Sequence, residues 1–139
     1  SGKVVKRCTG SEACPATLPD YSGVTFETGR NTDNCCVANS LNSKATEFLK
    51  EVGKNCDVIV TSAASGCHAF GSDHYGGCAV DLATSGVTRS CLKKAGFKLD
   101  SGSYTPGTCV FESWANHYHC TLCNSGGPGT VGYDNDGSY

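Results

Sequence analysis

The sequence predicts a small α+β domain with a mostly antiparallel sheet, flanking helices and many disulfides. Its 139 residues fit a single domain and are enough to bury a core. The expected elements run in the order helix, strands, short helix, strands, which favours an antiparallel sheet with helices beside it. Eleven cysteines, about 8% of the chain, reach the level at which a disulfide scaffold is expected.

The first half of the chain contains one clear helix and one clear strand. Residues 37–53, VANSLNSKATEFLKEVG, space their apolar side chains as one buried helix face, and Gly53 predicts the end of the helix. Residues 56–63, CDVIVTSA, predict a buried strand because 58–61 are all β-branched. Residues 1–34 are rich in Gly, Thr, Ser, Pro and Asp, so we expect loops and short extended pieces held by disulfides.

The second half is predicted to supply most of the sheet. Residues 62–77 form a long irregular loop, and such loops in compact domains are often functional. The remaining elements are a strand at 78–84, a short helix at 87–97 that stops at Gly96, and strands near 97–99, 108–111 and 117–122. The tail, residues 124–139, is Gly-rich and poor in apolar residues, so we expect it to be loosely ordered beyond a domain of residues 1–123.

Charge and hydropathy argue against several classes of partner. The net charge is −2 and the pI is near 6.0, with no block of like charges. We therefore expect no nucleic acid or membrane partner, and the apolar runs are too short to span a bilayer. We expect a monomer. The chain begins Ser-Gly and contains no methionine, so we interpret it as a processed or trimmed form.

The cysteine content predicts an oxidising compartment and hence a secreted protein. The odd count of 11 leaves at least one cysteine unpaired, so we expect five disulfides and one remaining thiol. The alternative is a zinc site made of four cysteines. Only Cys120 and Cys123 have the Cys-x-x-Cys spacing, so this alternative is disfavoured.

Three of the four histidines lie in two short stretches, GSDHYGGCAVDL and ESWANHYHC. His74 and Asp81 are separated by Gly76 and Gly77, which permit the loop to approach the strand closely. His117 and His119 are two residues apart, so on a strand they share a face. Two histidines and one aspartate meet the ligand count of a catalytic zinc site, which leaves one position open. A structural role for His74 and simple strand packing for His117 remain the alternatives.

The segment SDHYGGCAVD, residues 72–81, matches the pattern Ser-x-His-x-x-Gly-x-Ala-x-Asp. It resembles the zinc signature of the D-Ala-D-Ala carboxypeptidase family. That family also includes L-Ala-D-Glu endopeptidases, vancomycin-resistance D,D-dipeptidases and the hedgehog signalling domain. The later segment ESWANHYHC, residues 112–120, resembles the family's Glu-Ser…His-x-His-Cys segment. The resemblance covers roughly residues 57–121 and implies the hedgehog-like fold.

The resemblance also implies roles for individual residues. One zinc ion per chain would be bound by His74, Asp81 and His119. Glu112 would act as the general base and His117 would sit beside the metal as a second catalytic residue; the alternative for Glu112 is a solvated surface carboxylate. Ser72, Tyr75 and Trp114 are further candidates for substrate contact, with packing in the core or at the rim as the alternative for both aromatic rings. We expect Cys78 and Cys120, which flank the ligands, to form disulfides that brace the site.

The expected function is therefore a secreted zinc metallopeptidase that hydrolyses stem or cross-link peptides of bacterial peptidoglycan. An endopeptidase is favoured over a carboxypeptidase, because residues 61–66, TSAASG, lack the arginine with which many of the carboxypeptidases meet a substrate carboxylate. The gap between Glu112 and His117 is one residue longer than in the hedgehog pattern, and Asn116 looks like the insertion. The alternatives are a catalytically inactive, zinc-containing hedgehog-like binding module and a disulfide-stapled toxin or inhibitor without metal.

Overall fold

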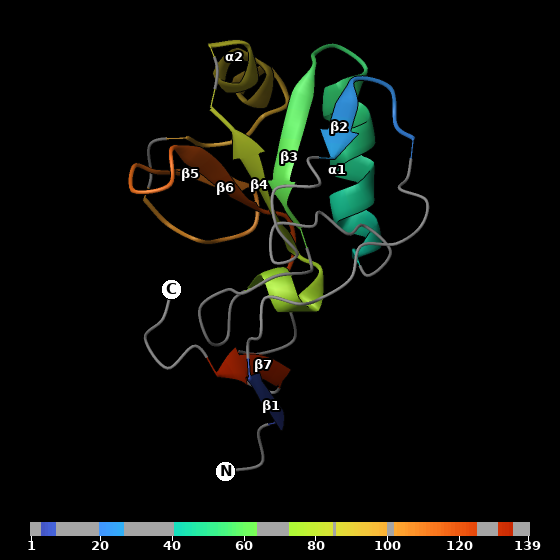
Figure 1. Ribbon diagram of the computed structural model, residues 1–139. Helices are drawn as coiled ribbons and strands as arrows, with labels where there is room; N and C mark the ends of the chain where they lie inside the picture. Colours follow the sequence, from blue (N-terminus) through green and yellow to red (C-terminus); the bar gives the residue numbers. More distant parts are fainter. Residues whose placement is uncertain are drawn as a thin grey trace.

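The computed structural model describes residues 4–7, 20–26, 41–63, 73–84, 86–99, 102–124 and 131–134. The elements in these ranges, shown in Figure 1, are β1 (Val4–Arg7), β2 (Val24–Phe26), α1 (Ser43–Gly53), β3 (Val58–Ser62), the 3-10 turn η2 (Asp73–Gly76), β4 (Ala79–Ala83), α2 (Gly86–Lys94), β5 (Thr108–Glu112), β6 (His117–Thr121) and β7 (Val131–Asp134).

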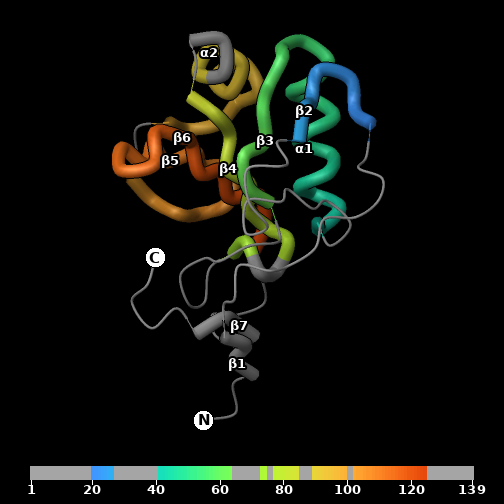
Figure 2. Tube along the Cα trace, in the orientation of Figure 1, coloured from blue at the N-terminus to red at the C-terminus, as the bar shows by residue number. Residues whose placement is uncertain are grey.

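The main sheet has five strands in the order β2-β3-β4-β6-β5. Every neighbouring pair in it is antiparallel except β2 and β3, which run parallel. The trace in Figure 2 shows β4 and β6 side by side in the interior of this sheet. The predicted α+β class with a mostly antiparallel sheet is thus confirmed. β1 and β7 form a separate two-stranded parallel ladder, and β7 falls within the Gly-rich tail.

One face of the sheet packs against both helices to form the core. Side chains alternate along a strand, so Val80 and Leu82 of β4 point to this face while Asp81 points to the other. Tyr118 of β6 lies opposite Leu82 and belongs to the same cluster. The helices contribute buried apolar side chains to that cluster, namely Phe48, Leu49 and Val52 from α1 and Cys91 and Leu92 from α2.

Helix α1 begins later than its apolar periodicity predicts. The helix starts at Ser43, because Asn42 has an extended backbone and its side-chain oxygen accepts a hydrogen bond from the Lys44 amide at 3.0 Å. The prediction of helix at residues 41–42 is therefore wrong, and residues 37–40 lie outside the described ranges. The predicted end at Gly53 is confirmed. A β-carbon there would lie 2.0 Å from the Ser22 carbonyl oxygen, so only glycine allows the chain before β2 to approach.

Helix α2 runs from Gly86 to Lys94 and ends in a glycine cap, as predicted. Gly96 has a φ of +89°, its amide donates to the Lys93 carbonyl, and the Phe97 amide donates to the Leu92 carbonyl. The cap turns the Phe97 ring onto Phe48 of α1, with 4.6 Å between ring centroids. The strand predicted at 97–99 is reduced to a single bridge between Lys98 and Thr108. Strand β2 lies within residues 1–34, where short extended pieces are expected without defined bounds.

Three disulfides join the described elements. Cys56 pairs with Cys91 of α2, Cys78 pairs with Cys123, and Cys109 of β5 pairs with Cys120 of β6. The other cysteines, at positions 8, 14, 35, 36 and 67, lie outside the described ranges, so the expected total of five disulfides stays a prediction.

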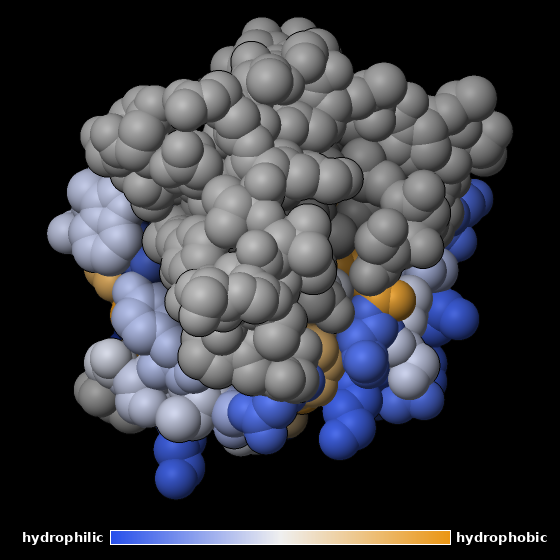
Figure 3. Space-filling view, turned by 90° about the horizontal axis from the view of Figure 1, so that it is seen from below, coloured by the Kyte–Doolittle hydropathy of each residue, from blue (hydrophilic) through white to orange (hydrophobic). Residues whose placement is uncertain are grey.

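Within the described ranges, no helix has the length and apolar character needed to cross a membrane. On the face seen in Figure 3, most of the coloured side chains are hydrophilic.

The central position of β4 makes its core-facing side chain a test of the fold. Leu82 is fully buried, whereas Ile59 on the neighbouring strand β3 is 44% exposed. We expect Leu82→Ala to lower the free energy of unfolding by about 2–5 kcal/mol, because the cavity in the core cannot refill. Ile59→Ala is the matched control and should cost much less. Urea denaturation of the oxidised protein measures both values, and equal losses would contradict this packing.

Candidate metal centre

Strand register brings the polar side chains together on the face of the sheet opposite the core. Asp81 of β4 lies directly opposite His119 of β6, and Glu112 of β5 lies directly opposite His117 of β6. Because alternate residues share a face, His117 and His119 project to the same side, as the sequence predicts. The sheet therefore presents two polar cross-strand pairs next to each other.

His74 reaches this face from η2, the turn that precedes β4. The turn closes with hydrogen bonds from the Gly77 amide to the His74 carbonyl and from the Cys78 amide to the Asp73 carbonyl, both 3.0 Å. Gly77 has a φ of +73°, a conformation that favours glycine, so the close approach predicted for the glycine pair is found here. The Gly77 carbonyl also accepts a hydrogen bond from the Asn42 amide, which ties the turn to the start of α1.

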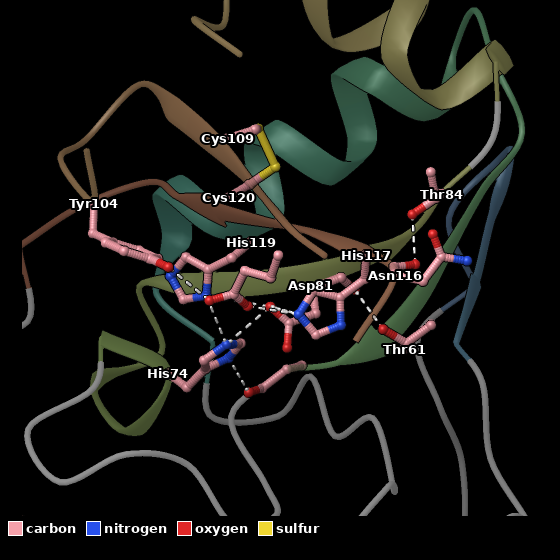
Figure 4. Close-up of polar contacts among 12 residues, drawn as sticks. Thr61, His74, Asp81, Thr84, Tyr104, Cys109, Asn116, His117, His119 and Cys120 are labelled. Carbon is pink, nitrogen blue, oxygen red and sulfur yellow. Dashed lines mark hydrogen bonds and ion pairs between the residues drawn. A yellow bond between two sulfur atoms is a disulfide. The ribbon is translucent and has the colours of Figure 1, made fainter. Parts of the chain in front are cut away.

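Three donor atoms converge at the centre of the site (Figure 4). His74 Nε2 lies 3.2 Å from Asp81 Oδ1 and 3.2 Å from His119 Nδ1, and the last two atoms are also 3.2 Å apart. The three residues are buried, with 2%, 5% and 6% of their surfaces exposed. A tetrahedral ion with bonds of about 2.0–2.2 Å separates its ligand atoms by about 3.3–3.6 Å, close to the triangle observed. The residues present therefore fit a metal ion, and together they can hold one.

The tautomer of His74 supports this interpretation. Its Nδ1 lies 2.8 Å from the Ala63 carbonyl oxygen, and because a carbonyl can only accept, Nδ1 carries a proton. With a metal ion bound, the neutral ring would therefore offer the lone pair of Nε2 to the ion, and without one a proton on Nε2 lets His74 donate to Asp81. A hydrogen bond from the outer ring nitrogen to a backbone carbonyl is the usual way in which a ligating histidine is oriented.

The electrostatics of the cluster also call for a positive charge at its centre. Burial raises the pKa of Asp81, but the charge on His74 and hydrogen bonds from His119 and His74 outweigh it and lower that pKa. Burial lowers the pKa of His74, but the Asp81 carboxylate outweighs it and raises that pKa. A buried carboxylate with two imidazoles is thus stable when a proton or a cation lies among them.

The hydrogen-bonded pair of His117 and Glu112 lies beside the cluster of His74, Asp81 and His119. The His117 ring donates from Nε2 to Glu112 Oε1 at 2.6 Å, and the Tyr104 hydroxyl donates to Glu112 Oε2 at 2.8 Å. Burial raises the pKa of Glu112, but these two hydrogen bonds outweigh it and lower that pKa. Burial lowers the pKa of His117, but the same bond to Glu112 and the Asp81 charge raise it. At neutral pH, Glu112 is therefore ionised and hydrogen-bonded at both oxygens.

Tyr104 is a site residue that the sequence does not reveal. It lies in the loop between Lys98 and β5, and its ring packs edge-on against His119 with 5.0 Å between centroids. Desolvation and the bond to Glu112 raise the Tyr104 pKa to about 12, so its hydroxyl stays a donor. The surrounding SGSYTPG segment signals a turn, but no local pattern indicates that its phenol reaches Glu112.

The hairpin between β5 and β6 explains the spacing of Glu112 and His117. Residues 113–116 form the loop, and Asn116 adopts a positive φ of 52°, which asparagine tolerates better than most residues. The Thr84 hydroxyl donates to the Asn116 carbonyl, which links the loop to the end of β4. With four loop residues, the chain places Glu112 and His117 exactly opposite in register, so the extra residue does not separate them.

The structure describes some of the remaining candidate site residues and leaves others outside the described ranges. Cys78 and Cys120 are in disulfides, as expected, and are not available as thiolate ligands. Trp114 sits in the β5–β6 loop with 77% of its surface exposed, so it is not a core residue. Ser72 and the side chain of Tyr75 lie outside the described part of the chain.

Comparisons with known proteins do not place the chain: no protein-family model, no curated protein and no solved structure matches it. The interpretation of the site therefore depends on its own residues and geometry.

Loss of any one of the three converging ligands should abolish metal retention. We expect wild-type protein loaded with zinc and dialysed to keep about one ion per chain. His74→Ala, Asp81→Asn and His119→Ala should weaken binding by more than about 100-fold, the upper range for loss of a merely orienting partner. His117→Ala is the matched control and should retain the ion. Metal analysis by mass spectrometry measures occupancy, and wild-type occupancy in the three ligand variants would refute the site.

Proposed function

We propose that the protein is a secreted zinc metallopeptidase of the D-Ala-D-Ala carboxypeptidase type, with that family's hedgehog-like fold. Its substrates are the stem or cross-link peptides of bacterial peptidoglycan. The observation that carries the proposal is the pair of clusters on one sheet face: His74, Asp81 and His119 converge on one point, and an ionised Glu112 lies beside them. The substrate class rests on the resemblance of residues 72–81 to that family's zinc signature.

Zinc is the metal that suits this donor set best. Two imidazole nitrogens and one carboxylate oxygen are typical ligands of a catalytic zinc site, in which a fourth position stays open. When bound, zinc lowers the pKa of water toward about 7 and polarises a carbonyl group. The three disulfides support the proposed secretion, because such bonds persist in oxidising compartments.

Glu112 and His117 would handle the proton. Glu112 is the acceptor, since its carboxylate is ionised at neutral pH and its side chain keeps 13% of its surface exposed to solvent. His117 Nε2 lies 3.6 Å from Asp81, beside the proposed metal, so its N–H would stabilise negative charge that develops on a substrate oxygen once it leaves Glu112. Tyr104 holds the second oxygen of Glu112 and fixes the plane of the carboxylate.

The choice of an endopeptidase follows from the charges around the site. A carboxypeptidase needs a cation that binds the free carboxylate of its substrate. Among the described side chains, Arg89 donates to the Tyr118 hydroxyl, and Tyr118 projects from β6 to the core face. Arg89 thus contacts a core-facing side chain, and residues 61–66, TSAASG, contain no arginine, which supports cleavage within a peptide and not at its C-terminus.

One observation favours a second candidate, a catalytically inactive hedgehog-like binding module that retains zinc. Both oxygens of Glu112 already have donors, from His117 and from Tyr104, so a base that is engaged in this way has to exchange a partner before it takes a proton. The candidates differ in one measurement. Purified peptidoglycan is incubated with the protein, with and without a chelator, and released peptides are identified by mass spectrometry. Chelator-sensitive cleavage supports the peptidase, whereas co-sedimentation without cleavage supports the module.

The role of Glu112 as the proton acceptor predicts a large and selective loss. Glu112→Gln keeps the size of the side chain and removes its basicity, and positioned general bases contribute about 10²–10⁴-fold. We expect a decrease of that size in kcat for peptide cleavage, with zinc content unchanged. Glu51→Gln is the matched control, since Glu51 is exposed on α1 and, in the described part of the chain, forms an ion pair with Lys54. Wild-type rates in Glu112→Gln would exclude Glu112 as the base.

Tyr104 should have a smaller effect on the same step. Tyr104→Phe removes the 2.8 Å hydrogen bond to Glu112 but keeps the ring against His119. A hydrogen bond of this kind contributes about 0.5–1.5 kcal/mol, so we expect a decrease in kcat of about 2- to 10-fold with little change in KM. Tyr21→Phe, whose ring packs on Phe26, provides the control. A change confined to KM would instead assign Tyr104 to substrate binding.

A further inference from the structure

A second set of metal-binding atoms lies next to the first and shares Asp81 with it. Asp81, Glu112 and His117 each offer one nitrogen or oxygen atom, and these atoms all lie within 4.8 Å of one another. We propose that this set is a second, weaker zinc site, and that its occupation by excess zinc inhibits the peptidase. The inhibition depends on the proposed function, whereas the site itself does not.

The donors of the second set have the same chemistry as those of the first. One imidazole nitrogen and two carboxylates are ligands that zinc accepts readily. His117 Nε2 is 2.6 Å from Glu112 Oε1 and 3.6 Å from Asp81 Oδ1, so one ion can be reached by all three after a small rearrangement. The side chains of His117 and Glu112 are 17% and 13% exposed, so these two ligands are more open to solvent than His74 and His119 of the first set, at 3% and 8%.

The geometry also explains why this site must be the weaker one. The hydrogen bond of 2.6 Å between His117 and Glu112 is shorter than the spacing of about 3.3 Å that ligands of one zinc ion require. An ion therefore has to separate the two side chains and release the proton between them to solvent. A second divalent ion is also repelled by an ion already held through Asp81. By contrast, the first triangle needs almost no movement.

Occupation of the second site would disable the residues that handle the proton. Glu112 and His117 would both direct their lone pairs to the ion, so Glu112 could no longer accept a proton. Tyr104 competes for the same carboxylate through its bond to Glu112 Oε2. Removal of that hydroxyl should therefore leave the second ion bound at least as tightly as in the wild type.

The test is a zinc titration of protein that already holds its first ion. Zinc chloride is added by equilibrium dialysis, and the bound metal per chain is measured. We expect a second equivalent in wild type, in Tyr104→Phe and in the remote control Glu51→Gln. Glu112→Gln and His117→Ala should bind the first equivalent and lose the second, and circular dichroism should show that both variants remain folded.

The outcomes separate the site from the function. A wild type that stops at one zinc overturns the second site, and so does a second equivalent that persists in Glu112→Gln, because that result shows adventitious surface binding only. Where peptide cleavage is observed, excess zinc should inhibit it at the concentrations that fill the second site, and inhibition at unrelated concentrations overturns the link. A second equivalent without any cleavage under any condition keeps the site and refutes the peptidase.

Discussion

The burial of one carboxylate shapes the centre of this protein. Asp81 lies in the middle of the sheet, between two residues of β4 that are completely buried in the core. An ionised carboxylate removed from water is costly unless charged or hydrogen-bonding partners surround it. The register of β6 supplies His119, and the turn η2 supplies His74, each 3.2 Å away. Because side chains alternate along β4, burial of Val80 and Leu82 in the core places Asp81 on the opposite face. That buried carboxylate needs polar partners there.

Several constraints hold that cluster in place from outside. The Cys78–Cys123 disulfide joins the residue before β4 to the chain that follows β6, and Cys109–Cys120 joins β5 to β6. These links cross the same strands that carry the ligands, so the spacing of Asp81 and His119 does not depend on a metal ion alone. Gly77 and the capping residue Asn42 add a backbone hydrogen bond between the turn and α1. The fold thus sets the positions of the proposed ligands His74, Asp81 and His119, and such preorganisation favours tight and selective binding of a metal ion.

Sequence patterns predicted those parts of the protein in which local chemistry and tertiary packing agree. Strand β3 is marked by its β-branched residues, and β4 and β6 contain the histidine and aspartate motifs. The existence of these strands and the shared face of His117 and His119 could therefore be predicted. The start of α1 could not be predicted, because Leu41 continues the apolar period although the next residue, Asn42, caps a helix that begins at Ser43. β2 has three residues and is held by its parallel pairing with β3. The role of Tyr104 could not be predicted, because its hydrogen bond to Glu112 connects a loop to the end of a strand and no local sequence pattern indicates such a contact.

The two histidines of β6 show how the same residue type acquires different chemistry from its position on a strand. His119 is central, with Asp81 on one side and Val110 on the other, and it presents Nδ1 to the ligand cluster. His117 is the first residue after the hairpin, beside Glu112, and presents Nε2 to that carboxylate. Its side chain is 17% exposed, compared with 8% for His119. The deeper position of His119 suits the metal ligand that we propose, and the more exposed position of His117 suits the group proposed to exchange protons, so two residues on one strand would separate the two roles.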